Sequence, residues 1–230
     1  ISNSSFTRTN SSNIDGGAIY VHGANAVITT SNFTMNNAKR YGGSIYISGF
    51  NATILDSNFA LSNATDSGGS IYIQGDLTEI SGSTFTKSHA DRDGGVIYVS
   101  GKNAYIYDSD FLMSSSNMGG AVFIAGYNAT IVKSTFDKVN ATQSGGAIYI
   151  EGQYATVANS NISNSVAKSQ SGYVATNLGV AIYISGNNAN ISYSKIDLST
   201  AMEGGAIYSI GSHSTVYYSN FTDNIAQANG

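Results

Sequence analysis

The segment Gly42-Gly43-Ser44-Ile45-Tyr46-Ile47-Ser48-Gly49 decides the fold, because it returns as Gly68-Gly69-Ser70-Ile71-Tyr72-Ile73-Gln74-Gly75. The same pattern of two glycines, a small, an aliphatic and an aromatic residue begins at Gly16, Gly42, Gly68, Gly94, Gly119, Gly145 and Gly204, with a degenerate copy at Gly179. These starts are separated by 26, 26, 26, 25, 26, 34 and 25 residues. A fixed period of this length is typical of stacked structural repeats, so we expect one solenoid domain over residues 1–230.

The pattern within one repeat predicts short strands around a core. Counted from the first glycine, positions four and six are aliphatic, as in Ile45 and Ile47, and position seven is mostly polar, so odd positions of this strand should face solvent. Position eight is glycine in every repeat, which predicts a bend that needs positive φ or a close backbone approach. Positions eleven and thirteen form a second inward-facing pair, as in Ala52 and Ile54.

A third strand carries serine at position sixteen and an inward aromatic or aliphatic residue at position eighteen. The position-eighteen residues should stack in the core, and they are Phe33, Phe59, Phe85, Phe111, Phe136, Ile162, Ile196 and Phe221. Small polar residues at position twenty-one, such as Asn36 and Ser62, can satisfy a corner by hydrogen bonding along the axis. We therefore predict an all-β, right-handed parallel β-helix of about eight coils of about 26 residues, with three short strands per coil.

The composition limits the classes of partner. Charged residues make up 10% of the chain, the net charge is −4, and there is no Lys/Arg run, which argues against nucleic acid and anionic membranes as partners. Pro and Cys are both absent, which suits long hydrogen-bonded ladders and excludes thiolate sites and disulfides. No stretch is apolar enough to insert in a membrane, and a surface of Ser, Thr and Asn suits an extracellular location.

Position five is aromatic in every repeat and should face outward, which predicts an exposed aromatic ladder. Its members are Tyr20, Tyr46, Tyr72, Tyr98, Phe123, Tyr149, Tyr183 and Tyr208. Small residues at position three should leave the rings uncovered on that side. Two roles stay open: stacking of like on like can stabilise the sheet, and the ladder can be a contact surface for sugars, apolar side chains or another rod.

We find no repeating catalytic cluster and expect no catalytic residue, metal or cofactor. Asp56 and Asp108 share position fifteen, but they lie two coils apart with Gly82 between them. Asp108 and Asp110 form a local pair without a basic partner, and Asp91-Arg92-Asp93 should be a solvated salt cluster in a turn. His22, His89 and His213 occupy different positions of different coils, so each should be a lone, solvent-facing histidine.

Two further features bear on the surface. Ten Asn-X-Ser/Thr sequons are possible N-glycosylation sites, at Asn3, Asn10, Asn32, Asn51, Asn63, Asn128, Asn140, Asn161, Asn190 and Asn220. The sixth coil is longer than the others, and the excess falls at about 169–177, where we expect an insertion loop.

The recurring motifs resemble those of the adhesin-like repeat proteins of methanogenic archaea and of the chlamydial polymorphic membrane proteins. The resemblance rests on Gly-Gly-Ala-Ile-Tyr at 16–20, 145–149 and 204–208, and on Phe33-Thr34-Met35-Asn36 and Phe221-Thr222-Asp223-Asn224. It covers essentially the whole chain, although Ser62, Ser88, Ser114 and Val139 replace the asparagine. It implies a right-handed parallel β-helix at the cell surface with a role in adhesion or envelope structure.

We therefore expect a non-enzymatic cell-surface or extracellular β-helix, part of a longer surface protein or of a fibre. Its expected partners are other copies, joined end to end or laterally into filaments, and cell-surface carbohydrate or protein. The alternative is a polysaccharide-binding or polysaccharide-processing β-helix, which would need carboxylates on adjacent coils of one face. Asp56 with Asp108, flanked by Glu79, is the one weak candidate for such a site.

Overall fold

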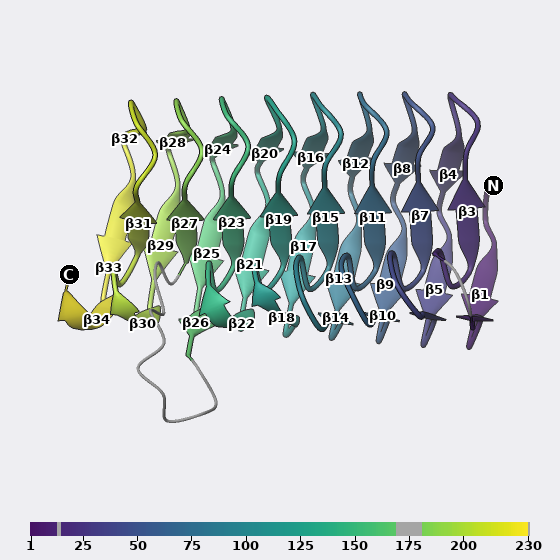
Figure 1. The fold of residues 1–230 in the computed structure, drawn as a ribbon, viewed down its shortest axis with the longest axis horizontal. Helices are drawn as coiled ribbons and strands as arrows, with labels where there is room; N and C mark the ends of the chain where they lie inside the picture. The colour runs from purple at the N-terminus through teal and green to yellow at the C-terminus, as the bar shows by residue number, and fades with distance from the viewer. Residues whose placement is uncertain (13–14, 169–180, 230) are drawn as a thin grey trace.

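The computed structural model describes residues 1–12, 15–168 and 181–229, and the expected insertion at 169–177 lies outside them. The described chain winds into an all-β parallel solenoid of about eight turns (Figure 1). Each strand pairs in parallel with the strand one coil away, and equivalent residues stand opposite each other, as in Ile71↔Ile45, Tyr72↔Tyr46 and Ile73↔Ile47. The predicted β-helix with coils of about 26 residues is confirmed.

The structure has four parallel sheets, where the sequence pattern predicted three. The first sheet is formed by positions four to six, in the strands β3 (Ile19–Val21), β7 (Ile45–Ile47), β11 (Ile71–Ile73), β15 (Ile97–Val99), β19 (Val122–Ile124), β23 (Ile148–Ile150), β27 (Ile182–Ile184) and β31 (Ile207–Ser209). The second sheet is formed by positions twelve to fourteen, in β4 (Val27–Thr29), β8 (Thr53–Leu55), β12 (Glu79–Ser81), β16 (Tyr105–Tyr107), β20 (Thr130–Val132), β24 (Thr156–Ala158), β28 (Asn190–Ser192) and β32 (Thr215–Tyr217).

The third sheet contains the predicted phenylalanine column. Its strands are β1 (Ser5–Thr7), β5 (Asn32–Thr34), β9 (Asn58–Ala60), β13 (Thr84–Thr86), β17 (Asp110–Leu112), β21 (Thr135–Asp137), β25 (Asn161–Ser163), β29 (Lys195–Asp197) and β33 (Asn220–Thr222). The fourth sheet consists of β2 (Asn10–Ser11), β6 (Asn37–Ala38), β10 (Asn63–Ala64), β14 (His89–Ala90), β18 (Ser115–Met118), β22 (Asn140–Ser144), β26 (Val166–Ala167), β30 (Thr200–Glu203) and β34 (Ile225–Asn229). Many of its strands have two residues, too few for alternation to reveal them in the sequence.

Left-handed backbone at fixed positions turns the chain at each corner. In the second coil these residues are Gly42, Asn51, Asp56 and Leu61, with φ of 62°, 56°, 48° and 56°. The glycine at position eight has a different cause: a Cβ on Gly75 would lie 1.9 Å from the carbonyl oxygen of Gly49 in the preceding coil. Close backbone approach, and not positive φ, therefore requires this glycine.

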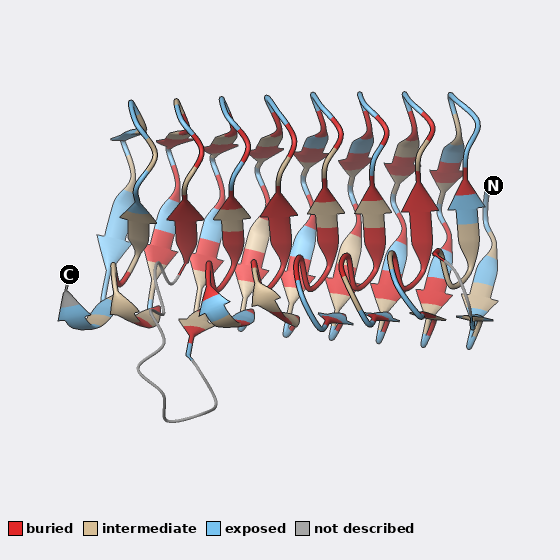
Figure 2. Cartoon of the chain, viewed as in Figure 1, coloured by how far each residue is buried: buried red, intermediate tan, exposed pale blue. Residues whose placement is uncertain are grey.

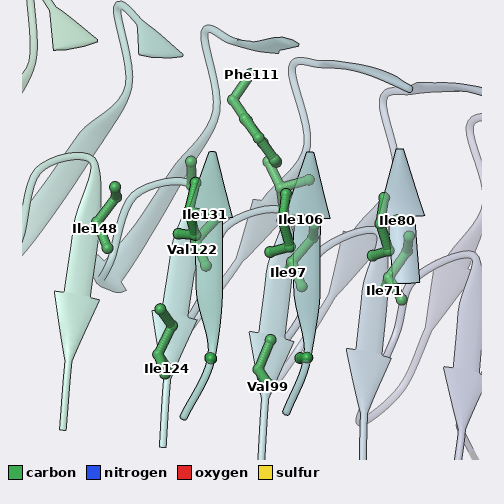
Figure 3. Packing of buried hydrophobic residues seen from close by; sticks show 14 of the residues in the cluster. Ile71, Ile80, Ile97, Val99, Ile106, Phe111, Val122, Ile124, Ile131 and Ile148 are labelled. Carbon is green, nitrogen blue, oxygen red and sulfur yellow. The ribbon is translucent and has the colours of Figure 1, made fainter. Parts of the chain in front are cut away.

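The core is a continuous column of aliphatic and aromatic side chains. Phe33, Phe59, Phe85, Phe111 and Phe136 are buried, and successive rings stack with centroids 4.6–5.0 Å apart. Figure 3 shows part of this cluster, with Ile97 and Val99 of β15 and Ile106 of β16. The core is buried along the middle of the rod, while residues of the last coil, such as Phe221, are exposed (Figure 2).

Buried serines support the corners from inside. At position sixteen each backbone N–H donates to the serine hydroxyl of the next coil, as from Ser83 to Ser109 Oγ at 3.3 Å, and that hydroxyl donates to the carbonyl two residues earlier. At position twenty-one, Ser62 Oγ shares a hydrogen bond of 2.7 Å with Ser44 Oγ of position three. The predicted hydrogen bonding along the axis is present where asparagine occurs, since Thr9 N donates to Asn36 Oδ1 at 3.0 Å.

Candidate functional site

The aromatic residues of position five form one stacked column on the outer side of the first sheet. Successive ring centroids are 4.5–5.8 Å apart, with interplanar angles of 6–24°. The parallel register produces this column, because each ring stands directly opposite its equivalent in the next coil. We call this set, from Tyr20 to Tyr208, the aromatic ladder.

The prediction that the ladder is openly exposed is wrong for most of its members. Tyr20 is 51% exposed, but Tyr46, Phe123 and Tyr183 are buried and the other four are half-buried. Each inner ring has its two faces covered by its neighbours, so the column presents ring edges and hydroxyl groups. A sugar ring therefore cannot stack on the face of an inner ladder residue.

The small side chains of position three were also expected outside, and they lie inside. Ser44 and Ser70 are fully buried, and their hydroxyl groups bond to Ser62 and Ser88 of position twenty-one. These residues line an inner corner and do not border the ladder. The ladder is instead flanked by the residues of position seven.

Ladder hydroxyl groups bond to position seven of the next coil. Tyr46 Oη donates to Gln74 Oε1 at 2.7 Å, and burial raises the pKa of Tyr46 to about 12. Burial raises the pKa of Tyr149 to about 12, while its hydrogen bond with Ser185 lowers this pKa and its hydrogen bond with Tyr183 raises it. These phenols are therefore neutral hydrogen-bond donors at physiological pH.

Two shallow hollows lie beside the ladder, over the column of position-eight glycines. One has a volume of about 390 Å³ and is lined by residues that include His22, Phe50, Gln74 and Asp76. The other has a volume of about 520 Å³ and is lined by Tyr98, Ala125, Tyr127, Glu151, Gly152 and Gln153. Phe50 and Tyr127 occupy position nine of their coils and are 56% and 47% exposed. The openly accessible aromatic residues of this side thus lie next to the ladder.

A charged column runs along the corner before the first sheet. Arg40 Nε and Nη2 donate to the two carboxylate oxygens of the buried Asp15 at 2.8 and 2.7 Å. The Arg40 guanidinium also lies 4.9 Å from the ring of Tyr41, which contacts the ladder at Tyr72. Arg92 lies 3.4 Å from Asp66 farther along. This column fixes one border of the first sheet.

Asp93 departs from the predicted solvated salt cluster, because its side chain is buried. It is 7% exposed, and its Oδ1 has no hydrogen-bond partner among the described residues. Burial raises the pKa of Asp93 to about 6, while Arg92 lowers this pKa and Asp66 and Glu151 raise it. Position twenty-six, where the chain turns into the next coil, thus places one carboxyl against the protein interior.

The histidines are exposed as predicted, but two of them are not alone. His22 Nδ1 lies 3.0 Å from Ser48 Oγ, and His89 lies 2.9 Å from Ser115 Oγ and 3.0 Å from Asp91 Oδ1. The second set combines the residue types of a hydrolytic triad. The same His–Ser contact recurs at His22, where the two residue types also follow one another in a column, so the contact does not by itself indicate catalysis.

The carboxylates considered as a catalytic pair lie apart in the fold. Asp56 and Asp108 occupy equivalent corners two coils apart, and the Asp56 carboxylate covers Gly82 between them, where a Cβ would lie 2.2 Å from Asp56 Oδ1. Asp110 belongs to β17 in the third sheet, and Glu79 belongs to β12 in the second. Within the described ranges, no three His, Cys, Asp or Glu residues lie close enough to hold a metal ion.

The sequon asparagines fall on outer corners and strands. Asn190 is half-buried and the other nine are exposed. Three of these side chains donate along the axis to an asparagine of the preceding coil: Asn51 to Asn25, Asn63 to Asn37 and Asn128 to Asn103, at 2.7, 3.0 and 2.8 Å. Their accessibility is compatible with modification.

No family model, curated protein or solved structure matches this chain. The described residues include no helix that is long and apolar enough to span a membrane. Sequence reasoning missed the hollows beside the ladder. A comparison of the residue at position five of each coil with the residue at position seven of the next coil would have indicated where these hollows lie.

Proposed function

We propose that this protein is a non-enzymatic, extracellular scaffold of the cell surface that acts as a stalk or adhesin and associates with other copies. The observation that carries the proposal is the uninterrupted pairing of four parallel sheets along the rod. Such continuous ladders resist bending and present the same side chains at every coil. The surface of Ser, Thr and Asn, with 10% charged residues in the chain, supports the extracellular location.

The side that bears the ladder is the best candidate for lateral contact. Phe50 and Leu77 are 56% and 51% exposed at neighbouring turns beside the first sheet. Apolar side chains that stand together in solvent favour burial against a partner. Association end to end would continue the parallel pairing that joins each coil to the next. Exposed sequons support glycosylation of the scaffold.

The test is sedimentation velocity of the full chain over a range of concentrations. We expect association that weakens when Phe50→Ser and Leu77→Ser are combined. Leu198→Ser is the matched control, because Leu198 is 52% exposed at a corner between the third and fourth sheets. A chain that stays monomeric throughout, or equal losses in the variant and the control, would contradict lateral association.

Electron microscopy at low concentration separates the modes of assembly. Separate rods of roughly 40 Å, from eight coils at about 4.8 Å each, indicate a stalk, and continuous fibres indicate end-to-end association. Release of soluble sugars from a polysaccharide by the purified chain would overturn the non-enzymatic role.

A further inference from the structure

Several hydroxyl groups of the aromatic ladder contact position seven of the next coil. Tyr46 Oη donates to Gln74 Oε1 at 2.7 Å. Hydrogen bonds also join Tyr72 with Ser100 and Tyr149 with Ser185, and each of these lowers the pKa of the tyrosine. The stacked, parallel arrangement of the rings keeps the direction the same along the column.

Two consecutive steps of the ladder lack the residues for this contact. Tyr98 is followed at position seven of the next coil by Ala125, whose methyl group cannot accept a hydrogen bond. At the next step Phe123 has no hydroxyl group to donate to Glu151, whose side chain is exposed. A tyrosine hydroxyl group and a carboxylate in adjacent coils thus lack this contact across the ladder.

Both groups line the hollow of about 520 Å³ beside the ladder. Its floor is the glycine column, where Gly152 cannot carry a side chain because a Cβ would lie 1.9 Å from the Gly126 oxygen. Gln153 adds an amide that can donate and accept. The exposed Tyr127 adds an aromatic ring, which contacts Tyr154 with centroids 5.0 Å apart at an angle of 49°.

We infer that this hollow is a binding site for one neutral hexopyranose unit of an oligosaccharide, held by Tyr98, Glu151 and Gln153 beside Tyr127. Sugar hydroxyl groups both donate and accept hydrogen bonds, so one hydroxyl group can accept a hydrogen bond from Tyr98 Oη and a neighbouring one can donate to Glu151. The apolar C–H face of a pyranose can pack on the accessible ring of Tyr127. Its size is ordinary for a small-ligand site.

The second hollow beside the ladder, next to Phe50, is lined by different polar groups. Phe50 stands there at the same position as Tyr127, and the volume is about 390 Å³. Gln74 in that hollow, however, already accepts a hydrogen bond from Tyr46. The Glu151 carboxylate at the equivalent position, and not the exposed ring alone, distinguishes the saccharide site. The site goes beyond the scaffold role proposed above and does not depend on self-association.

The experiment uses an array of neutral hexose oligosaccharides, followed by calorimetric titration of the monomeric full chain with the array member that binds best. We expect Ala125→Ser, which supplies an acceptor for Tyr98 at position seven, and Tyr127→Ser each to weaken binding about tenfold. Phe50→Ser is the matched control and should leave the affinity unchanged. Circular dichroism confirms that each variant keeps its β-structure.

Three results would overturn the inference. The first is no binding to any array member. The second is binding that Ala125→Ser and Tyr127→Ser do not weaken. The third is binding of hexalysine that depends on Glu151 in the absence of sugar binding, which would assign the carboxylate to a cationic peptide. Loss of self-association in the same protein would leave the sugar affinity unchanged, so the two proposals fail separately.

Discussion

Gly101 lies so close to the neighbouring coil that an added methyl group should disturb the packing of the two coils. A Cβ there would lie 2.0 Å from the Gly75 oxygen, whereas a Cβ at Gly23, the equivalent residue of the first coil, meets nothing within 4 Å. Since the contact is backbone, the clash cannot be relieved by a rotamer change. We expect Gly101→Ala to lower the free energy of unfolding by about 3 kcal/mol and Gly23→Ala by less than about 1 kcal/mol.

Urea denaturation of the two glycine variants measures this difference. Equal stability of the two variants would show that the coils can separate slightly to admit a methyl group. The spacing of neighbouring coils at position eight would then be adjustable, and glycine would be there for another reason.

Asp93 makes stability depend on pH. Burial raises its pKa from 3.8 to about 6 in the folded chain, so the folded state holds this proton more tightly than the unfolded state. Stability from this group is therefore fully present below pH 4 and falls as the pH rises toward 6, by roughly 3 kcal/mol. Arg92, Asp66 and Glu151 are the charged groups that act on it.

The expected result is that Asp93→Asn removes the decline between pH 4 and pH 6. The matched control is Asp110→Asn, because Asp110 is an exposed residue of β17. Thermal unfolding across this pH range measures both. A wild-type curve without a fall in this window, or the same change in both variants, would contradict a proton held by Asp93.

At the scale of the strand, the phenylalanine column of the third sheet supplies the largest fully buried side chains of the core. Phe85 is fully buried and stacks between Phe59 and Phe111, with centroids 4.8 and 5.0 Å away. Phe85→Ala should cost about 3 to 5 kcal/mol, because it removes burial and stacking on both sides and leaves a cavity. Phe221→Ala, at a ring that is 42% exposed, should cost less than about 1.5 kcal/mol. Chemical denaturation compares the two, and equal costs would argue against the column.

The strands also show which features the sequence could predict. The repeat of two glycines and the alternation of Ile45, Tyr46 and Ile47 determine the coil length, the parallel register and the direction of these three side chains. The exposure of Tyr46 could not be predicted in the same way, because it depends on rings of two other coils that cover its faces. The fourth sheet was missed since Asn37–Ala38 and its equivalents are too short to show a period.

The candidate saccharide site could be predicted from the sequence only in part. Ala125 and Phe123 are visible departures from the columns to which they belong. Their consequence appears only when position five is placed against position seven of the following coil, which requires knowing how far a tyrosine reaches across the sheet. Alternation within a strand specifies the outward direction of a side chain, but the atoms that it meets come from another coil.

At the scale of the whole molecule, every sheet joins a coil to its immediate neighbours alone, so stability should vary along the rod. Strands at the two ends, such as β31, should open more easily than central strands such as β15. Hydrogen exchange should therefore be fastest at the ends of the dilute chain and slowest in the middle coils. Uniform protection would indicate one cooperative unit.

The same measurement at high concentration tests the assembly. If copies join end to end, amides of β31 gain hydrogen-bond partners from another copy, and their exchange should slow as the concentration rises while that of β15 stays constant. Lateral association through Phe50 and Leu77 would bury side chains without pairing the edge of β31, so protection at the ends would not change. Constant exchange at β31 in a sample that sedimentation shows to be associated would therefore exclude end-to-end stacking and leave the side of the rod as the contact.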